Sequence, residues 1–587
     1  MSKFGLFGLA WALVVVQPVF AEEVLKVVYP PQNHETTANQ IFLIGTASPN
    51  TEVTVNGQVI RDRSPGGHFS PSLPLQIGDN TFTLRSGTQT LTLTVRRKST
   101  TLVLPSTLGF AEGSLTPKVD IARLPQDPVC FSAIATPNAQ VSVRLGNQVL
   151  ALVPQTQAAL PPNSAVLTAA NQPITAQPGL YQGCTKFSDV KPTVLGKPVF
   201  EVRQGNALVS QPGTGQVEIL SPQTQSSIEV TSAQGVARTG PSTDFSRLTP
   251  LPKGTQASVT GREGEWLRLD YGGWIKQGET RPISTTQTQS LIRSVRVQTL
   301  GDRTRILFPL QSPVPVTVQQ RPGTVTLTLH NTIAQTDTIL QTPDAVLSRL
   351  DWQQVAPNRI EYQIQLKTQQ QWGYALNYEG TSLVLSLRHP PKLTARSSSS
   401  KTSLSGTTIL LDPGHGSSND LGALGPTGYP EKDVTLIVSK LLRTELEQRG
   451  AKVIMTREGE DDLYPNDRVA KIEQTSPTLA LSLHYNALPD AGDAWKTQGI
   501  STYWYHPQAQ NLAVFLHDYL TQKLQRPSYG VYWNNLALTR PAIAPSVLLE
   551  LGFMINPQEF EWITNPQAQR RLAATLADGI TAWFHQP

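Results

Sequence analysis

The chain has two parts that differ in the periodicity of their hydrophobic residues. Up to about residue 392, short runs alternate apolar and polar residues, as in 140–145 and 148–150, which flank Gly146-Asn147. This period of two is typical of half-buried strands joined by hairpins. After residue 407, short apolar runs alternate instead with longer segments of helical period. We therefore expect a multidomain chain that is β-rich first and α/β at its C-terminal end.

The C-terminal segment, residues 407–587, predicts a mainly parallel or mixed sheet with helices on both faces. A Ser-rich stretch at 393–406 is expected to be a flexible linker before it. The expected strands are 407–411, 452–455, 479–483, 500–504 and 546–550, and the expected helices are 431–449, 466–474, 508–525 and 566–584.

Changes in composition and turn pattern divide the β-rich part into four modules. At 587 residues the chain is too long for one core, so several domains are expected. Residues 153–178 are rich in Pro, Ala and Gln, which predicts a long loop inside the second module. The expected modules are residues 22–100, 101–216, 217–284 and 287–392.

The N-terminus has the parts of a secretory signal peptide. Lys3 precedes an apolar run from Phe4 to Val16, and a Val-x-Ala sequence ends at Ala21. We expect residues 1–21 to be cleaved off as a signal peptide. An uncleaved membrane anchor is the alternative, although the apolar run is short for a membrane span. The mature protein is therefore expected to be exported.

Composition excludes some functions without selecting one. A formal net charge of +5 is small for this length, and no Lys- or Arg-rich cluster with interleaved aromatic residues indicates nucleic-acid binding. The only cysteines, Cys130 and Cys184, lie in the second module, where export permits a disulfide without requiring it. Their spacing matches no metal motif, and we expect no catalytic thiol.

Residues that can bind a metal stand at the ends of elements in the C-terminal domain. His415 follows the first strand, in Asp412-Pro413-Gly414-His415-Gly416, and Glu431 opens the first long helix. His484 and Glu550 each end an otherwise apolar strand. Two imidazoles and one carboxylate are a common zinc set that leaves a position for water, whose pKa zinc lowers. A second carboxylate can then take and return the proton.

Each of these residues also has a structural alternative. Glu431 can be a favourable charge at a helix N-terminus, and His484 can be a core histidine bonded to the backbone. Glu550 can pair with an arginine such as Arg540. The order and setting of the residues together nevertheless favour a metal site. Two histidines of the same domain are rival ligands, His506 after a strand and His517 in an amphipathic helix.

The motifs around these residues closely resemble the family-3 type of zinc-dependent N-acetylmuramoyl-L-alanine amidases. The resemblance covers essentially all of residues 407–587, and Arg457 and Arg468 also fit family positions. The matching motifs are Asp412-Pro413-Gly414-His415-Gly416, Glu431-Lys432, Ser482-x-His484-x-Asn486 and Leu549-Glu550-x-Gly552-Phe553-x-x-Asn556.

The resemblance implies a function and a role for each site residue. His415, Glu431 and His484 would bind one zinc ion, and Glu550 would be the catalytic glutamate. The enzyme would use zinc-activated water to cleave the peptidoglycan amide that joins N-acetylmuramic acid to the L-alanine of the stem peptide. A zinc peptidase acting within the stem peptide, or a catalytically inactive wall-binding scaffold, are the alternatives.

The resemblance also predicts where the protein acts and how it is controlled. An exported wall hydrolase would work in the periplasm or cell wall, with peptidoglycan as its partner and envelope or divisome proteins as candidate partners. A further glycine often follows the His-Gly pair in the family, whereas this chain has Ser417-Ser418-Asn419-Asp420. Residues 487–499 are too short for the inserted helix that blocks zinc in some relatives, so we do not expect gating by that route.

Three β-rich modules resemble known families. Residues 22–100 resemble a bacterial immunoglobulin-like module, and 101–216 read as a second β-sandwich. Residues 217–284 resemble the bacterial SH3-like barrel, through phrases such as Gly272-Gly273-Trp274, and 287–392 resemble the AMIN domain of envelope amidases. These resemblances imply wall binding by the barrel and targeting by the AMIN-like domain.

Overall fold

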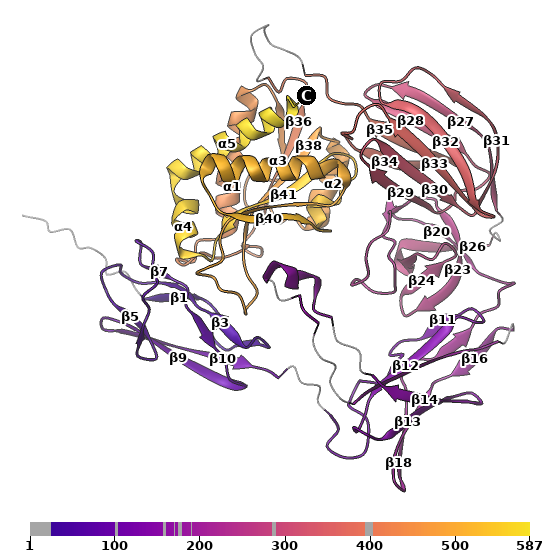
Figure 1. The fold of residues 1–587 in the computed structure, drawn as a ribbon, viewed down its shortest axis with the longest axis horizontal. Coiled ribbons are helices and arrows are strands. Elements are labelled where there is room, and N and C mark those ends of the chain that lie inside the picture. The colour runs from indigo at the N-terminus through magenta and orange to yellow at the C-terminus, as the bar shows by residue number, and fades with distance from the viewer. Residues whose placement is uncertain are drawn as a thin grey trace, which may run out of the picture.

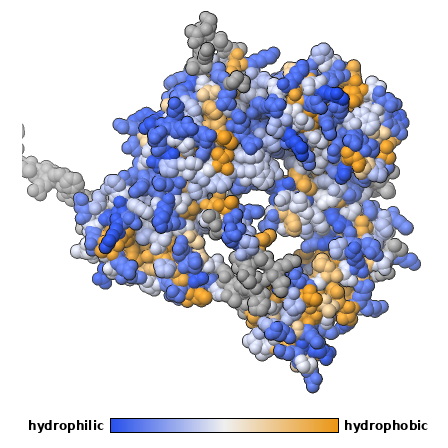
Figure 2. Space-filling view, in the orientation of Figure 1, coloured by the Kyte–Doolittle hydropathy of each residue, from blue (hydrophilic) through white to orange (hydrophobic). Residues whose placement is uncertain are grey.

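The computed structural model describes residues 25–99, 104–155, 160–168, 171–173, 179–188, 191–284, 289–393 and 403–586. The predicted signal peptide lies outside the described residues, as does most of the predicted linker. Figure 1 shows the domains along an open ring, in which the α/β domain has the first module on one side and the fourth module on the other. Figure 2 shows hydrophobic positions scattered over this mainly hydrophilic face.

The first module packs short strands around its own core, which includes Leu43, Phe69 and Leu84. Its main sheet has the order β2-β10-β9-β5-β6, and the long β9–β10 hairpin alternates buried and exposed residues as predicted for half-buried strands. The strands are β1 (Lys26–Tyr29), β2 (His34–Thr36), β3 (Gln40–Phe42), β4 (Ile44–Thr46), β5 (Val53–Val55), β6 (Gln58–Val59), β7 (His68–Phe69), β8 (Ser72–Pro74), β9 (Gly78–Ser86) and β10 (Gln89–Arg97).

The second module has a separate core around Phe131 and Phe200. Cys130 lies opposite Cys184 in the β12–β15 ladder, and the two form a disulfide. Part of the predicted loop forms a 3-10 helix, η1. The elements are β11 (Ile121–Arg123), β12 (Pro128–Ile134), β13 (Gln140–Leu145), β14 (Gln148–Pro154), η1 (Asn163–Thr168), β15 (Leu180–Lys186), β16 (Thr193–Gly196), β17 (Val199–Gln204), β18 (Ala207–Pro212) and β19 (Val217–Ile219).

The third module shares a sheet with the second, in the order β16-β19-β11-β23-β20-β26. β19 begins at the predicted boundary but pairs with β11 and β16 of the second module. β11 in turn pairs with β23 of the third module, so backbone hydrogen bonds join the two modules. The elements are β20 (Ser227–Val230), β21 (Gln234–Gly235), β22 (Leu251–Pro252), β23 (Gln256–Glu263), β24 (Trp266–Leu269), β25 (Trp274–Lys276), η2 (Gln277–Glu279) and β26 (Thr280–Ile283).

The fourth module packs two antiparallel-rich sheets, β31-β27-β28-β35-β34 and β29-β30-β33-β32, around Phe308 and Tyr362. Arg388 reaches the α/β domain, where its guanidinium donates to the carbonyl of Ser476 at 2.7 Å. The strands are β27 (Ser290–Leu300), β28 (Arg303–Pro309), β29 (Val316–Arg321), β30 (Thr324–His330), β31 (Thr332–Gln341), β32 (Leu347–Ala356), β33 (Arg359–Leu366), β34 (Tyr374–Glu379) and β35 (Ser382–Arg388).

The α/β domain has one six-stranded sheet, in the order β37-β36-β38-β41-β39-β40. The predicted mixed sheet is confirmed, since β39 runs antiparallel to β41 and the other neighbours are parallel. The elements are β36 (Thr408–Pro413), α1 (Glu431–Gln448), β37 (Lys452–Met455), α2 (Pro465–Thr475), β38 (Leu479–Asn486), β39 (Ile500–Trp504), α3 (Pro507–Leu524), β40 (Ser528–Trp533), η3 (Ala537–Thr539), β41 (Ser546–Phe553), α4 (Pro557–Thr564) and α5 (Pro566–Phe584).

Helices cover both faces of this sheet, as predicted. Ile409 and Leu411 share a core with α1, α3 and α5, whereas Leu410 faces the opposite core with Ile472 of α2, because alternate residues of a strand face opposite sides. Leu404, at the end of the predicted linker, is already buried in the first of these cores. Among the described residues, no helix is both long and apolar enough to cross a membrane.

Candidate metal centre

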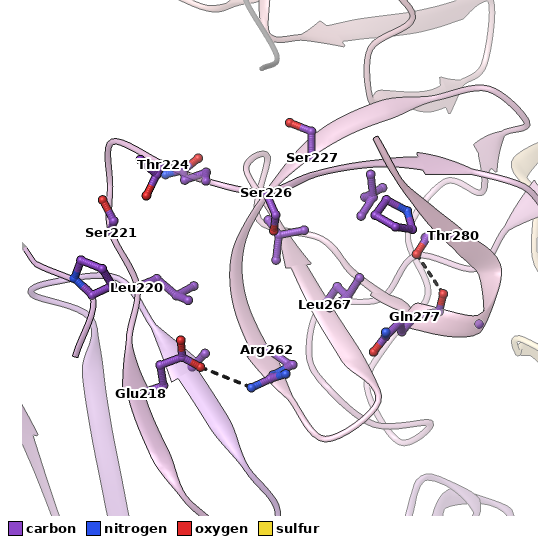
Figure 3. Close-up of a pocket in the computed structure, with 17 residues that line it drawn as sticks. Glu218, Leu220, Ser221, Thr224, Ser226, Ser227, Arg262, Leu267, Gln277 and Thr280 are labelled. Carbon is purple, nitrogen blue, oxygen red and sulfur yellow. Dashed lines mark hydrogen bonds and ion pairs between the residues drawn. The ribbon is translucent and has the colours of Figure 1, made fainter. Parts of the chain in front are cut away.

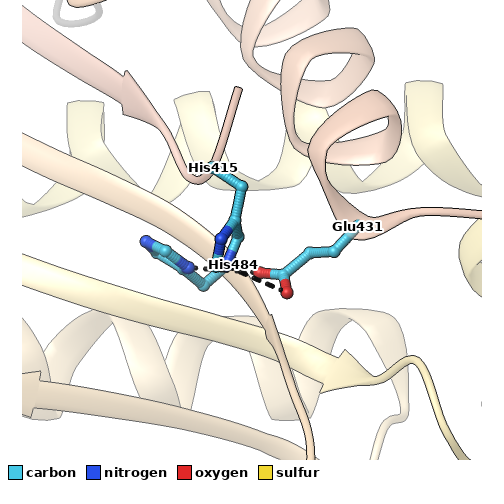
Figure 4. A group of neighbouring side chains, drawn as sticks. All are labelled: His415, Glu431 and His484. Carbon is cyan, nitrogen blue, oxygen red and sulfur yellow. Dashed lines mark hydrogen bonds and ion pairs between the residues drawn. The ribbon is translucent and has the colours of Figure 1, made fainter. Parts of the chain in front are cut away.

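Three of the predicted site residues converge at the carboxyl ends of β36 and β38. One ligand atom each from His415, Glu431 and His484 lies within 4.8 Å of the others. His415 Nε2 lies 3.1 Å from Glu431 Oε2, and His484 Nδ1 lies 3.1 Å from Glu431 Oε1. Figure 4 shows the carboxylate of Glu431, from the start of α1, pointing at both imidazoles. The structure thus brings together residues that are 69 positions apart at most.

The turn that presents His415 needs an unusual backbone. His415 has a φ of 59°, which is left-handed and uncommon for a residue other than glycine. A Cβ atom on the preceding Gly414 would lie 2.3 Å from the His484 ring, so only glycine lets the two strand ends approach this closely. Strained backbone of this kind persists where surrounding contacts hold it, and it is concentrated at functional sites.

Two buried arginines hold this turn. The Arg468 guanidinium donates to the His415 carbonyl at 2.6 Å and to Asp412 Oδ1 at 2.8 Å. The Arg457 guanidinium donates to the Gly414 carbonyl at 2.9 Å. Burial alone would raise the pKa of Asp412, but Arg468 and neighbouring hydroxyls hold that pKa below its usual range. The turn is therefore anchored by ionised groups that water does not reach.

The charges within the cluster suit a cation. Burial lowers the pKa of His415, but hydrogen bonds to Glu431 and Asp420 outweigh this and raise it to about 9. Burial raises the pKa of Glu431, but the two histidines outweigh it and lower that pKa below its ordinary value. Both shifts show that the cluster favours positive charge beside the Glu431 carboxylate. A divalent ion can supply that charge at the same position.

Glu550 lies beside the cluster on the neighbouring strand. In the β38–β41 ladder its Cα is the register partner of His484. Its Oε2 atom is buried and has no hydrogen-bond partner among the described residues. Burial, and then the negative charge of Glu431, raise the pKa of Glu550 well above its usual range. An orphaned buried carboxylate next to a second carboxylate is costly unless a positive charge joins them, so this donor set fits a bound metal ion.

Among the described residues, Glu550 does not form the alternative pair with Arg540, whose guanidinium donates instead to Asn535 Oδ1 at 2.7 Å. Glu431 does stand at the N-terminus of α1, and its carboxylate also contacts both imidazoles. His506 Nε2 lies 2.7 Å from the Arg540 carbonyl, and His517 Nε2 lies 2.8 Å from Ser528 Oγ. Within the described residues, the metal-ligand cluster contains neither of these rival histidines.

Asp420 is a site residue that the sequence analysis did not identify. Its Oδ1 atom accepts a hydrogen bond of 2.5 Å from His415 Nδ1, which leaves Nε2 of the same ring directed at Glu431. Carboxylates commonly fix metal-binding histidines in this way. The available signal was an aspartate five residues after a candidate ligand, in the loop that follows the His-Gly pair.

We expect Asp420→Asn to weaken zinc binding by about tenfold, the lower end of the effect seen when a ligand's outer partner is lost. The amide can still accept a hydrogen bond but no longer stabilises the ring by charge. Competition with a chromophoric chelator measures the affinity. Asp462→Asn is a matched control in the same loop region, because its carboxylate accepts from Ser417 and Asn419 rather than from a ligand. Equal affinity of Asp420→Asn and wild type would show that Asp420 does not orient His415.

A cavity of about 800 Å³ lies elsewhere, between the second and third modules. Figure 3 shows it lined by polar side chains such as Ser221 and Thr280 together with apolar ones such as Leu220 and Leu267, with the Glu218–Arg262 ion pair at one end. None of its described lining residues is a histidine or a cysteine. Its lining can contact a polar ligand, but it lacks the metal-binding and proton-transfer groups of the α/β domain.

Comparison with known proteins agrees with this geometry. Residues 409–582 match the family described as N-acetylmuramoyl-L-alanine amidase. The chain is 34% identical over 203 residues to the germination-specific N-acetylmuramoyl-L-alanine amidase of Bacillus subtilis (strain 168), a match that covers 31% of this chain and 81% of that protein. It is 35% identical over 194 residues to the probable cell wall amidase LytH of Staphylococcus aureus, covering 33% of this chain and 63% of that protein.

Solved structures of similar sequence come from the same group. The catalytic domain of CwlV, an N-acetylmuramoyl-L-alanine amidase from Bacillus (Paenibacillus) polymyxa var. colistinus, is 28% identical, and the match covers 30% of this chain and 97% of that one with a TM-score of 0.28. AmiC2 of Nostoc punctiforme is 27% identical, with coverages of 31% and 99% and a TM-score of 0.29. On the family match and on the identity to the Bacillus subtilis enzyme over most of its length, this chain belongs to the N-acetylmuramoyl-L-alanine amidase family.

Proposed function

We propose that this protein is an exported zinc amidase that hydrolyses the bond between N-acetylmuramic acid and the L-alanine of peptidoglycan stem peptides. The observation that carries the proposal is the His415, Glu431 and His484 cluster beside the orphaned carboxylate of Glu550, in the domain that matches the amidase family. Periplasm or cell wall is the proposed location, since the curated relatives include a cell wall amidase.

His415, Glu431 and His484 would hold the zinc ion through two imidazole nitrogens and one carboxylate. Bound there, zinc would polarise an amide carbonyl and would lower the pKa of a water molecule to near neutrality. The protein's own contribution is to keep the three ligands in place. The arginines that bind the turn carbonyls and the Asp420 hydrogen bond fix His415, while Glu431 is held by the backbone amides of Ala423 and Tyr485 at 2.8 and 2.9 Å.

Glu550 would transfer the proton. Its carboxylate takes a proton from water as the water oxygen bonds to the lactyl carbonyl carbon. The same proton then goes to the alanine nitrogen as the carbon–nitrogen bond breaks, leaving a free amine on the peptide and a carboxylic acid on the sugar. Because the Glu550 Oε2 atom is buried and has no hydrogen-bond partner among the described residues, it can exchange the proton with a bound substrate.

We further propose that the β-rich part directs the enzyme to its substrate. The modules would be an immunoglobulin-like sandwich at 22–100, a second sandwich at 101–216, an SH3-like barrel at 217–284 and an AMIN-like domain at 287–392. Each has its own hydrophobic core, and within the described residues none contains a second metal-ligand cluster. Such modules can bind the substrate and target the enzyme without taking part in catalysis.

Digestion of purified sacculi by the full chain tests the activity. We expect release of intact stem peptides with an L-alanine amino terminus, identified by mass spectrometry, and about one zinc ion per chain by elemental analysis. Shortened stem peptides would indicate the peptidase alternative instead. Sacculus binding without hydrolysis and without bound zinc would contradict the proposal and favour an inactive scaffold.

A further inference from the structure

The first module contacts the edge of the α/β domain that carries the site. Figure 1 shows this module beside α4, with β3 and β7 turned toward the α/β domain. The Gly66 amide donates to Glu561 Oε1 at 2.6 Å, and the ring of His68 meets that of Phe560 edge-on at 5.3 Å. These contacts place residues 25–98 within reach of the loops that surround the metal ligands.

One set of contacts reaches the loop that holds Glu431. Lys26 Nζ donates to the Thr427 carbonyl at 2.7 Å. Four residues earlier, the Ala423 amide donates to Glu431 Oε2 at 2.8 Å, and the Glu431 amide donates to the Ala423 carbonyl at 2.9 Å. The loop between Ala423 and Glu431 is therefore held by the ligand at one end and by the first module in its middle.

A second set reaches the segment that follows His484. His34 Nε2 lies 3.0 Å from Asp490 Oδ2, and the hydroxyl of Tyr29 donates to Oδ1 of the same carboxylate. Gln40 Nε2 donates to the Ala491 carbonyl at 2.6 Å. Asp490 lies six residues beyond His484, and three side chains of the first module therefore hold the chain soon after it leaves this ligand.

A third set is apolar and reaches the segment that follows Glu550. Phe42 and Ile44 of the first module share a buried cluster with Ala494, Phe553 and Ile555 of the α/β domain, in which no member is more than 4% exposed. Phe553 lies three residues beyond Glu550. A cluster from which water is excluded is a packed interface rather than a loose contact between tethered modules.

We propose that the first module is a positioning element of the catalytic domain, which clamps the three segments carrying Glu431, His484 and Glu550. The inference rests on the proposed function, which treats Glu431 and His484 as metal ligands and Glu550 as the proton-transfer group. The geometry is specific because each clamped segment lies within a few residues of a different site residue. Without the first module, these segments would sample several positions. Positions that move Glu431 or His484 away from the other ligands would weaken metal binding.

The test is the triple variant Lys26→Ala/His34→Ala/Gln40→Ala in the full chain. It removes the contacts that these three side chains make with Thr427, Asp490 and Ala491 and leaves the Tyr29 contact with Asp490 in place. The core of the first module stays intact, since none of the three residues belongs to that core. We expect hydrogen exchange to become about tenfold faster in residues 421–430 and 487–499, and zinc affinity to fall about tenfold. The matched control is Glu52→Ala/Gln58→Ala/Arg61→Ala, on the exposed surface of the same module, which should change neither quantity.

Asp490→Asn tests the same contacts from the catalytic side and is nearly isosteric, so it decides the matter even if the triple variant folds poorly. We expect it to speed exchange in residues 487–499. Unchanged exchange and unchanged zinc affinity in Asp490→Asn would overturn the clamp. Neither measurement uses a substrate. If the variants exchange faster while the wild-type protein also fails to release stem peptides, the proposed function alone is contradicted.

Discussion

Glu550→Gln is expected to lower kcat for stem-peptide release by about three orders of magnitude, within the range of 10²–10⁴ for the loss of a general base. Glutamine keeps the shape of the side chain but cannot take a proton from water or return it to the departing amine. Burial and the charge of Glu431 raise the pKa of the Glu550 carboxyl well above its usual range, and Glu550 is not one of the proposed zinc ligands. Zinc binding should therefore be unimpaired in Glu550→Gln. Initial rates on soluble muropeptides, with zinc measured in the same samples, test both statements.

The control for Glu550→Gln is Glu473→Gln in α2. Burial also raises the pKa of Glu473, to about 7, yet it faces Arg303 of the fourth module and not the metal site. It therefore reproduces the loss of a buried, partly protonated carboxyl without touching the chemistry, and we expect kcat close to wild type. Wild-type turnover by Glu550→Gln with normal zinc content would eliminate Glu550 as the proton-transfer group.

The sequence predicted the α/β domain well because its signals are local. Buried strands such as Leu479–Asn486 and long amphipathic helices such as Glu431–Gln448 show the period of their own structure, and structure confirms both. Two elements were missed. Strand Ser528–Trp533 lies at the sheet edge with little alternation in burial, and helix Pro557–Thr564 has only eight residues, too few to display a helical period.

The convergence of the proposed ligands could be inferred because neighbouring parallel strands end at the same edge of the sheet. Parallel neighbours place residues such as Pro413 and Leu483 side by side, so side chains just beyond them must share one crevice. Nothing in the sequence indicates that Asp490 meets His34, 456 positions away. Such contacts depend on how whole domains dock, and a docking surface built of ordinary apolar and polar residues has no period or motif of its own. The sequence of the first module therefore indicates an immunoglobulin-like module but no contact with the site.

His415→Asn is expected to weaken zinc binding by two to three orders of magnitude. Zinc sites contribute about 10 kcal/mol or more, so each of three ligands accounts for roughly 3–4 kcal/mol, and 1.4 kcal/mol is a factor of ten. Asparagine tolerates the left-handed backbone of this position, where φ is 59°, so lost affinity would report the missing imidazole rather than a distorted turn. Equilibrium competition with a chelator of known affinity measures the change.

The pH dependence of zinc affinity separates His415 from a merely structural residue. Glu431 and Asp420 raise the pKa of His415 to about 9 in the metal-free protein, so below that pH zinc must displace a proton. Wild-type affinity should therefore rise by about tenfold per pH unit as pH increases toward 9, and this slope should become shallower in His415→Asn. His517→Asn, which changes a buried histidine bonded to Ser528, should keep both the affinity and the slope of wild type. If His415→Asn kept the wild-type slope, the displaced proton would belong to another group and His415 would not be the ligand that titrates.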